Sequence, residues 1–382
     1  MAEFSDFDRA CMARALEIAR LGRGRTSPNP MVGAVLARDG KVIGEGYHAS
    51  YGAPHAEVAA ILSAGSGCEG ATLYVNLEPC CHFGRTPPCV DAILHAKIAR
   101  VVAAIEDPNP KVQGQGFERL REAGVLVESD LLREEALQLN EIFITFHTKR
   151  RPFIIAKWAM TLDGRVATDS GSSQWISNDE SRAYVHEIRS QCDAIMVGVG
   201  TVMRDNPRLS VRIKGYKGRQ PTRIIVDGWL RSPLGGRCFR QGRHAAPVIL
   251  AATAMAPQGR VERAEQAGHK VLILEGKRGI VDMNDLCAKL FENGITSVLV
   301  EGGRQIHTNM FREGLVDKTI VFIAPKLVGG KRATGPLDDL GVQLISEAAR
   351  LYRVKIQTFG ADVCIEGRVR DRKRGNGARN GA

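Results

Sequence analysis

The sequence carries His55-Ala56-Glu57 and, after one predicted helix and one predicted strand, Pro79-Cys80-Cys81-His82-Phe83-Gly84-Arg85-Thr86-Pro87-Pro88-Cys89. One imidazole and two thiolates bind zinc with a net charge near zero and leave a fourth position for water, as in catalytic sites. Thiolates near helix N-termini are stabilised by the helix dipole. Glu57 follows His55 by two residues, so its carboxylate can carry a proton from that water to a leaving group.

The segments around these motifs alternate between strands and helices. Short apolar runs predict a hairpin over 31–36 and 41–47, joined by Arg38-Asp39-Gly40. Helical spacing and further apolar runs extend the order to β-β-α-β-α-β-α, with an opening helix near Met12 to Ala19 and a closing one near Leu131 to Phe143. We therefore expect a three-layer α/β sandwich in which His55 and Cys80 lie at the same end of the sheet.

Two other interpretations of the cysteine and histidine cluster are open. A structural zinc site has four protein ligands, and Cys81 or His82 could supply the fourth. In the second interpretation, the cysteines are reduced core residues and no metal is bound. The presence of Glu57 and of the Pro79-Cys80 junction favours a catalytic zinc site.

The H-x-E motif with the later Pro-Cys resembles the zinc-dependent cytidine-deaminase-like superfamily, although eight residues separate Cys80 and Cys89 where that signature has two. With Ser27-Pro28-Asn29-Pro30-Met31-Val32-Gly33, this longer loop resembles the deaminase half of the bifunctional riboflavin-biosynthesis family. The resemblance implies that His55, Cys80 and Cys89 bind zinc, that Glu57 is the catalytic proton shuttle, and that Asn29 and His82 contact the pyrimidine.

A second α/β part begins after Lys149-Arg150-Arg151-Pro152, where the proline forces extended backbone on the residue before it. We expect one domain over 1–148, a second over 149–367 and a basic, disordered tail over 368–382. Strand and helix patterns alternate again from Phe153 onward, and the strands near 318–322, 352–357 and 363–369 are expected to close the sheet with an antiparallel edge.

Polar groups in this second part gather at strand ends, where open α/β sheets bind ligands. Lys157 to Arg165 follows the first strand, Gly198-Val199-Gly200-Thr201 follows the next, and Glu301-Gly302-Gly303-Arg304 opens a helix whose backbone amides can approach a phosphate. Each motif alone is weak, because Gly198-x-Gly200 lacks the third glycine of a dinucleotide fingerprint.

Together and in this order, these motifs resemble the reductase of the same pathway, whose fold is similar to that of dihydrofolate reductase. The resemblance covers about 1–145 and about 150–367. It implies NADPH binding at Ala159, Trp175, Thr201, Asp205, Gly228, Gly303, Arg304, Gln305, Ile306, His307, Thr308 and Asn309. It also implies substrate binding at Lys157, Ser173, Arg189, Leu209, Arg212 and Glu301.

Residue chemistry agrees with this in part. Two arginines and a serine suit a phosphomonoester, because guanidinium groups match phosphate oxygens. Without the resemblance, Arg189 and Arg212 would be read as solvated charges and Trp175 as a core residue. Arg204 and Arg208 favour NADPH over NADH, since they lie near the expected 2′-phosphate.

Composition limits the class of protein. A chain of 382 residues with 44% hydrophobic and 25% charged residues is an ordinary globular protein of about two domains. The formal net charge of +11 is concentrated at the end, where six basic residues face one aspartate after residue 367. No run of apolar residues is long enough to cross a membrane, and residues 1–8 do not resemble a signal peptide, so we expect a cytoplasmic protein.

The nine cysteines do not indicate a disulfide framework, since the number is odd and no export signal is evident. Those outside the zinc motif are isolated and are expected to be small buried hydrophobic residues: Cys11, Cys68, Cys192, Cys238, Cys287 and Cys364. We expect a small-molecule pyrimidine ribosylamino phosphate as substrate, no membrane partner and a homodimer or homotetramer.

Two other functions are open. A nucleic-acid base deaminase of the tRNA type would share the zinc motif and use the basic tail, but aromatic residues are only 5% and the second domain would be unexplained. A nucleotide-binding regulator without catalysis is the other, and the intact set of His55, Glu57, Cys80 and Cys89 argues against it.

Overall fold

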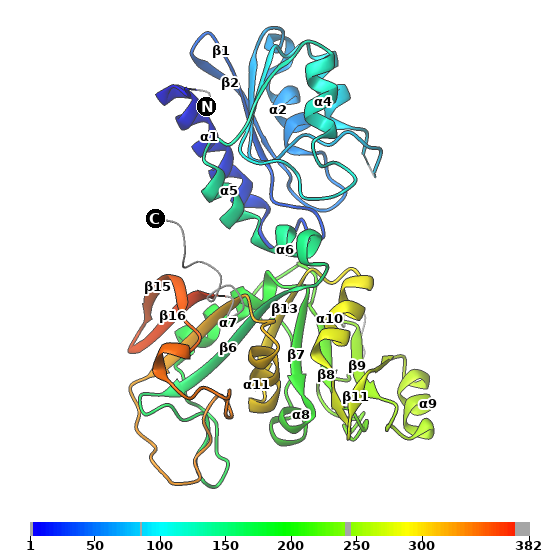
Figure 1. The fold of residues 1–382 in the computed structure, drawn as a ribbon, viewed down its shortest axis with the longest axis vertical. Helices are drawn as coiled ribbons and strands as arrows, with labels where there is room; N and C mark the ends of the chain where they lie inside the picture. Colours follow the sequence, from blue (N-terminus) through cyan, green and yellow to red (C-terminus); the bar gives the residue numbers. More distant parts are fainter. Residues whose placement is uncertain (1–2, 85, 241–245, 371–382) are drawn as a thin grey trace. The chain divides into compact units, whose positions relative to one another are not determined.

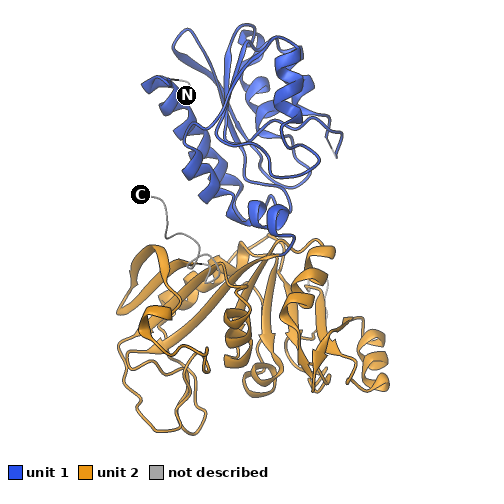
Figure 2. Ribbon diagram, viewed as in Figure 1, with its two compact units in different colours: residues 1–151 blue, residues 152–382 orange. Residues whose placement is uncertain are grey.

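The computed structural model describes residues 3–84, 86–240 and 246–370 and divides into two compact units, Met1–Arg151 and Pro152–Ala382 (Figures 1 and 2). The expected basic tail lies outside the described residues from 371 onward. Its first residues, Arg368 and Val369, belong to strand β16 (Asp362–Val369), so the second domain runs past its expected end at residue 367.

Unit 1 is built around a five-stranded sheet of order β2-β1-β3-β4-β5, in which only the β2-β1-β3 pairings are antiparallel. Its strands are β1 (Gly33–Arg38), β2 (Lys41–Tyr47), β3 (Thr72–Val75), β4 (Arg100–Ala103) and β5 (Leu126–Glu128). Its helices are α1 (Asp6–Ala19), α2 (Ala56–Ala64), α3 (Cys89–His95), α4 (Gln115–Glu122), α5 (Arg133–Leu139) and α6 (Glu141–Lys149).

Two apolar cores lie on the two faces of this sheet. One joins α1, α5 and α6 to side chains such as Val35 and Tyr74, and the other joins α2, α3 and α4 to side chains such as Leu36 and Leu73. Neighbouring residues of one strand serve opposite cores, as the alternation of a strand requires. This is the three-layer α/β sandwich expected from the sequence.

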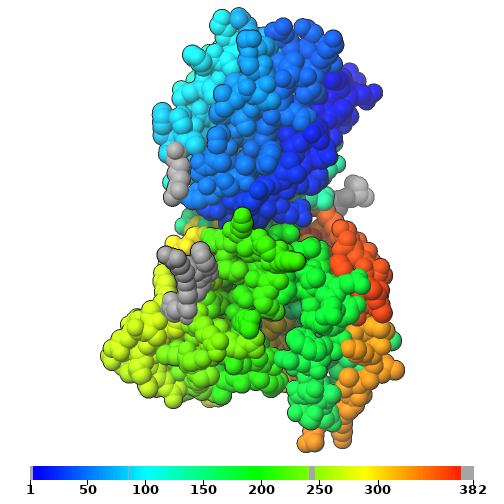
Figure 3. Space-filling view, turned by 180° about the vertical axis from the view of Figure 1, so that it is seen from behind, coloured from blue at the N-terminus to red at the C-terminus, as the bar shows by residue number. Residues whose placement is uncertain are grey.

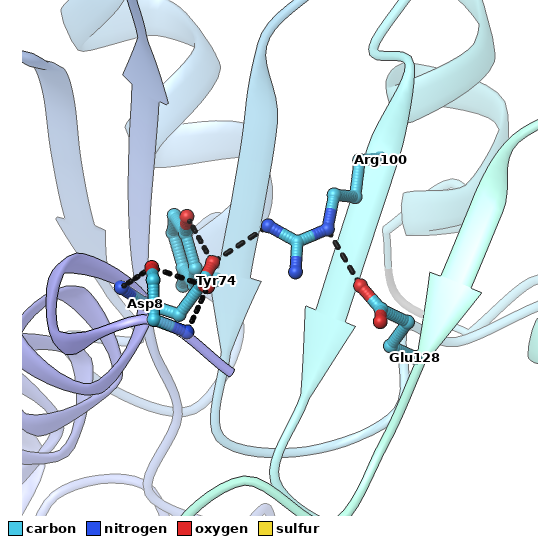
Figure 4. A network of polar contacts seen from close by, with 5 residues as sticks. Asp8, Tyr74, Arg100 and Glu128 are labelled. Atoms are coloured by element: carbon cyan, nitrogen blue, oxygen red, sulfur yellow. Dashed lines mark hydrogen bonds and ion pairs between the residues drawn. The ribbon is translucent and has the colours of Figure 1, made fainter. Parts of the chain in front are cut away.

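A polar network fastens α1 to the sheet (Figure 4). Asp8 is 6% exposed and accepts hydrogen bonds from Tyr74 Oη at 2.8 Å and Arg100 Nη1 at 2.6 Å, and it also caps α1 through Ser5. Arg100 donates from Nε to Glu128 at 2.6 Å. The network therefore ties the first helix to β3, β4 and β5.

The expected single helix near 131–143 is two helices, α5 and α6, which meet at Asn140. Asn140 is 3% exposed, and its side chain accepts from the Met31 N–H at 2.8 Å and donates to the Met31 carbonyl at 2.9 Å. The break places this amide against the segment after Asn29, and the pairing explains why a polar residue is buried here.

Unit 2 has a nine-stranded sheet of order β10-β9-β8-β7-β13-β6-β14-β16-β15 and a small hairpin, β11 (Gly276–Lys277) with β12 (Ile280–Val281). The strands are β6 (Phe153–Thr161), β7 (Ala194–Gly198), β8 (Thr222–Val226), β9 (Val248–Thr253), β10 (Lys270–Leu274), β13 (Ser297–Gly302), β14 (Lys318–Ala324), β15 (Leu351–Phe359) and β16. From β10 to β14 the pairings are parallel, and β16 and β15 add the antiparallel edge that the sequence predicted.

Helices cover both faces of the larger sheet. They are α7 (Asp179–Ser190), α8 (Val199–Asp205), α9 (Gln258–Gln266), α10 (Met283–Glu292) and α11 (Arg304–Arg312). Residues of α10 and α11 join one core, and residues of α8 and α9 join the other. Seen from behind, unit 2 presents its green and yellow-green segments, with the orange-red C-terminal strands along one side (Figure 3).

Within the described ranges, no helix combines the length and apolar character that a membrane span requires. All six isolated cysteines are buried, which confirms their expected role as small apolar residues.

Candidate active sites

Three predicted metal ligands converge at one end of the unit 1 sheet. His55 is the residue immediately before α2, Cys80 lies in the loop after β3, and Cys89 is the first residue of α3. The ligand atoms of His55, Cys80 and Cys89 all lie within 4.8 Å of one another. The expectation that both junctions lie at the same end of the sheet is confirmed.

The donor set fits zinc. His55 Nδ1 is 3.2 Å from Cys89 Sγ and 3.5 Å from Cys80 Sγ, while its Nε2 is 3.3 Å from the Thr86 hydroxyl. A ligating histidine whose other ring nitrogen contacts a polar group is held in one orientation, as metal sites require. The Cys89 N–H at the start of α3 also points at Cys80 Sγ, at 3.4 Å.

Hydrogen bonds from Cys89 and His55 lower the pKa of Cys80 despite its burial. A thiolate at a helix N-terminus beside an imidazole is the form that binds zinc. In the part of the chain that the structure describes, neither Cys81 nor His82 belongs to a group of candidate metal ligands. Cys81 Sγ faces the backbone of Lys111 and the side chain of Gln115 instead. The cluster therefore has three ligands, as a catalytic site does.

Glu57 lies beside these ligands and is 3% exposed. Burial, together with the negative charge of Cys80, raises the pKa of Glu57 to about 7. A carboxyl group whose pKa is near neutrality can both accept and donate a proton, which is what a shuttle must do.

His55, Cys80 and Glu57 face a cavity of about 250 Å³. The expected pyrimidine contacts, Asn29 and His82, both line it. Asn29 Nδ2 is 3.2 Å from His48 Nε2, and His48 Nδ1 is 3.1 Å from the Pro54 carbonyl, so the imidazole can accept from the amide. Within the described ranges His82 Nδ1 is buried without a hydrogen-bond partner, as expected of an atom that faces a ligand.

The cavity also contains residues that sequence reasoning missed. His48, Glu78, Asp107 and Asn109 line it, and the last two come from the loop after β4. Burial raises the pKa of Asp107 to about 7. The negative charges of Glu78 and Cys80 contribute to this rise in the pKa, whereas the hydrogen bond from the Asn109 N–H opposes it. Asp107-Pro108-Asn109-Pro110 after an apolar strand was the available signal.

The second candidate site lies along the edge of the unit 2 sheet where the parallel strands end. The strands β8, β7, β13 and β6 are neighbours. Gly228 follows β8, Thr201 follows β7, Gly303 follows β13 and Ala159 lies near the end of β6. The structure therefore brings these four expected cofactor residues to one edge, the position where open α/β sheets bind ligands.

Close approach of the backbone explains the glycines at this edge. A Cβ at Gly302 or Gly303 would lie 3.3 Å from Thr201 Oγ1, and one at Gly198 would lie 3.1 Å from Ile306 Cγ1. The first turns of α8 and α11 are thus packed against each other, and their N–H groups open toward the same edge.

The α11 residues expected near the cofactor do not all face outward. Ile306, His307 and Thr308 are buried, and His307 Nε2 is 3.1 Å from the Val300 carbonyl. Arg304 pairs with Asp338 at 2.9 Å. Gln305 is exposed and Asn309 is partly exposed, so they are available to a ligand, whereas the buried residues can contribute only through the backbone.

Trp175 is 65% exposed, which excludes the core role considered from the sequence. The Arg182 guanidinium lies 4.6 Å from the centre of its ring, and Lys326 Nζ donates to its carbonyl at 2.7 Å.

Ser173 lies in the same loop and is partly exposed. Asp205 ends α8, and burial raises its pKa.

The expected substrate residues centre on a buried ion pair. Arg189 Nε and Nη2 donate to Glu301 Oε1 and Oε2, both at 2.6 Å, and Arg189 Nη1 donates to the Ser210 carbonyl at 3.0 Å. Burial raises the pKa of Glu301, but the attraction of Arg189 outweighs it and holds the pKa at about 2. Arg189 is thus not a solvated charge, because two of its guanidinium nitrogens are bound to the Glu301 carboxylate.

The other expected substrate residues surround this pair. Burial lowers the pKa of Lys157, and the Glu301 carboxylate opposes the shift. The Arg212 N–H donates to His186 Nδ1 at 3.3 Å, and its side chain is exposed. Leu209 is 2% exposed and belongs to a core cluster, so only its backbone can contact a ligand.

Fold and sites together define a zinc-dependent deaminase unit joined to a reductase unit. Two family models agree: residues 5–105 match the cytidine and deoxycytidylate deaminase zinc-binding region, and residues 152–365 match the RibD C-terminal domain. The chain belongs to the RibD family of bifunctional riboflavin-biosynthesis enzymes, which combine a deaminase with a reductase.

Similar proteins span both units. The riboflavin biosynthesis protein RibD of Aquifex aeolicus is 44% identical over 94% of this chain and 98% of its own. A solved structure of Acinetobacter baumannii RibD is 32% identical with a TM-score of 0.85, covering 95% of this chain and 99% of that one. The diaminohydroxyphosphoribosylaminopyrimidine deaminase/5-amino-6-(5-phosphoribosylamino)uracil reductase of Thermotoga maritima is 36% identical with a TM-score of 0.79, with the same coverage.

Proposed function

We propose that unit 1 deaminates a diaminopyrimidinone ribosylamino phosphate and that unit 2 then reduces the ribosyl side chain of the uracil product with NADPH. The observation that carries the first step is the convergence of His55, Cys80 and Cys89 beside the buried Glu57, at a cavity lined by His55, Cys80 and Glu57. The ring of the substrate enters that cavity, and Asn29, His82 and Asn109 supply its polar contacts.

The deamination exchanges an exocyclic amine for an oxygen from water. Zinc held by His55, Cys80 and Cys89 would lower the pKa of a water molecule at this site. Glu57 accepts a proton from the attacking water and delivers it to the departing amine, which leaves as ammonia. Its raised pKa suits both transfers, because neither protonation state is strongly favoured.

The reduction takes place at the edge where β6, β13, β7 and β8 end. NADPH supplies a hydride when it is bound. The first turns of α8 and α11 provide backbone N–H groups for its phosphates, and Thr201 on α8 lies beside Gly303 at this edge. Arg212 and Ser173 bind the substrate phosphate, since both side chains are accessible.

Arg189 acts through Glu301 in this proposal. Its two hydrogen bonds fix the carboxylate, which faces the ammonium of Lys157. Glu301 and Lys157 then orient the ribosyl hydroxyl groups toward the cofactor. We further propose that the protein works in the cytoplasm and as a homodimer or homotetramer.

The test supplies purified protein with the diaminopyrimidinone ribosylamino phosphate and NADPH. Ammonia release and the decrease of nicotinamide absorbance are followed with and without prior chelation of zinc. We expect ammonia to appear before NADPH is consumed, and chelation to stop both. When the deaminated uracil compound is supplied instead, NADPH consumption should survive chelation. Absence of ammonia from a folded, zinc-loaded sample would overturn the deaminase assignment.

A further inference from the structure

Glu78 is a buried carboxylate whose role neither the metal site nor the proton shuttle accounts for. It precedes Pro79-Cys80, is 3% exposed and lines the deaminase cavity. Its backbone N–H donates to the Ile105 carbonyl at 3.0 Å, so the chain leaving β3 lies beside the chain leaving β4. The side chain therefore projects among the residues that follow β4.

Four backbone N–H groups donate to this one carboxylate. Oε2 accepts from Asp107 and from Gly114, both at 3.0 Å, and Oε1 accepts from Gly116 at 2.9 Å and Phe117 at 3.1 Å. The segment 107–114 is thus fastened at both ends to the same oxygen atom. Charge-assisted hydrogen bonds of this kind are about twice as strong as neutral ones.

Local sequence explains why a remote carboxylate is needed. Gly114 is the N-cap of α4 at φ 80°, and glycine offers no side-chain oxygen to the first N–H groups of the helix. Glu78 supplies that oxygen and places a negative charge at the positive end of the helix dipole. A Cβ at residue 116 would lie 2.2 Å from the Pro79 carbonyl oxygen, so Gly116 permits the contact.

The fastened segment forms one wall of the cavity. Asp107, Asn109 and Val112 all line it. They lie in the same pocket as the ligands His55 and Cys80, although they come from a later part of the sequence. In the described part of the chain no cation pairs with Glu78, and its charge is satisfied by the backbone N–H groups of Asp107, Gly114, Gly116 and Phe117.

We propose that Glu78 is a positioning residue for the deamination, which holds the 107–114 wall against the pyrimidine. The proposal rests on the proposed function of unit 1 and goes beyond it, since it assigns a role in substrate fit to a residue that is neither a metal ligand nor the proton shuttle. Replacement of Glu78 should weaken substrate binding and leave zinc binding intact, because its carboxylate accepts from the backbone of residues 107–117, although the ligand Cys80 follows it by two residues.

The experiment compares Glu78→Gln with the wild-type chain and with Asp8→Asn. Glutamine keeps the shape but presents an amide to backbone donors. Asp8 is a matched control, since it is also a buried carboxylate of unit 1 with several donors, and it lies outside the cavity lining. KM and kcat for ammonia release, zinc per chain and NADPH consumption with the deaminated compound are measured for each, with hydrogen exchange of the 107–117 amides.

For Glu78→Gln we expect KM to rise about tenfold or more, because a shift of about 1 Å in a positioning group can cost about 10²-fold. The amides of 107–117 should exchange faster, with zinc content and reductase activity as in the wild type. Asp8→Asn should lower stability without changing KM. Unchanged KM with faster exchange would overturn the proposal, as would loss of zinc, which would make Glu78 a support of the metal site.

A second variant covers the case in which Glu78→Gln does not fold. Glu78→Asp keeps the charge on a shorter side chain, and we expect a smaller rise in KM with the same zinc content. An unchanged KM for this variant, with its 107–117 amides exchanging faster, would also overturn the proposal. Failure of the wild type itself to release ammonia would count against the proposed function of unit 1 and is therefore a separate outcome.

Discussion

The guanidinium of Arg189 on α7 and the carboxylate of Glu301 on β13 form two parallel hydrogen bonds, each 2.6 Å long. Their side chains are only 12% and 9% exposed. Paired and buried in this way, each charge is tolerated only because of the other, and the pair joins a helix to the ligand-binding edge of the sheet.

Arg189→Met should destabilise unit 2 by about 3–5 kcal/mol, because it leaves the Glu301 carboxylate buried without its partner. Arg189→Lys should cost less, since the charge remains and only the fork is lost. Urea unfolding of both variants would measure this. Glu187→Gln, an exposed change on the same helix, serves as the control. Equal stability of Arg189→Met and wild type would contradict the prediction.

Glu57→Gln should reduce ammonia release by about 10²–10⁴-fold, because an amide cannot carry the proton from water to the amine. Reductase activity with the deaminated compound should be unchanged, since Glu57 belongs to unit 1. Zinc content, measured on the same sample, should equal that of the wild type. Retained deaminase activity would show that another group moves the proton.

Removal of zinc should lower the thermal stability of unit 1 and leave that of unit 2 unaffected, because a ligand that binds only the folded state stabilises it. The thiols of Cys80 and Cys89 and the imidazole of His55 then lose their shared partner. Calorimetry before and after chelation, followed by zinc addition, would resolve the change. A transition of unit 1 that is indifferent to zinc would speak against the site.

Asp8 makes the stability of unit 1 sensitive to acid. Hydrogen bonds from Ser5, Arg100 and Tyr74 outweigh its burial and hold its pKa below the ordinary value of 3.8. The unfolded chain therefore takes up this proton first as the pH falls, and the stabilising contribution, complete above about pH 4, declines below it. Asp8→Asn should cost about 1–3 kcal/mol at neutral pH. Denaturant unfolding at several pH values should show this difference shrinking in acid, and a constant difference would refute it.

Most of what could be predicted about unit 1 came from motifs whose residues lie close together in the sequence. His55, Glu57 and Cys80 lie at a helix start and a strand end, so their approach follows from local patterns and from the rule that such ends share one edge of a sheet. Asn140 could not be foreseen as a helix break, because its partner Met31 is distant in sequence. The same holds for Glu78, whose four donors lie well downstream of it.

In unit 2 the strand ends were predictable and the pairing of charges was not. No helix was predicted over Val199–Asp205, because glycine at 198 and 200 gives no helical pattern, and in the structure the start of α8 packs against the start of α11. Arg189 was expected to bind phosphate, whereas the fold brings Glu301 to its fork from a strand that begins more than a hundred residues later. The roles of the remaining residues in NADPH and substrate binding stay predictions.

The Asp107 and Gly114 N–H groups both bind Glu78 Oε2, so the loop between them has two fixed ends. Because its two ends are anchored, we expect the exposed residues between them to tolerate replacement while the anchors keep their places, provided that the buried Val112 is retained. A loop library inserted between the two anchored amides would therefore alter which ring fits the cavity without rebuilding the catalytic centre, which gives protein engineers a defined graft site in this scaffold.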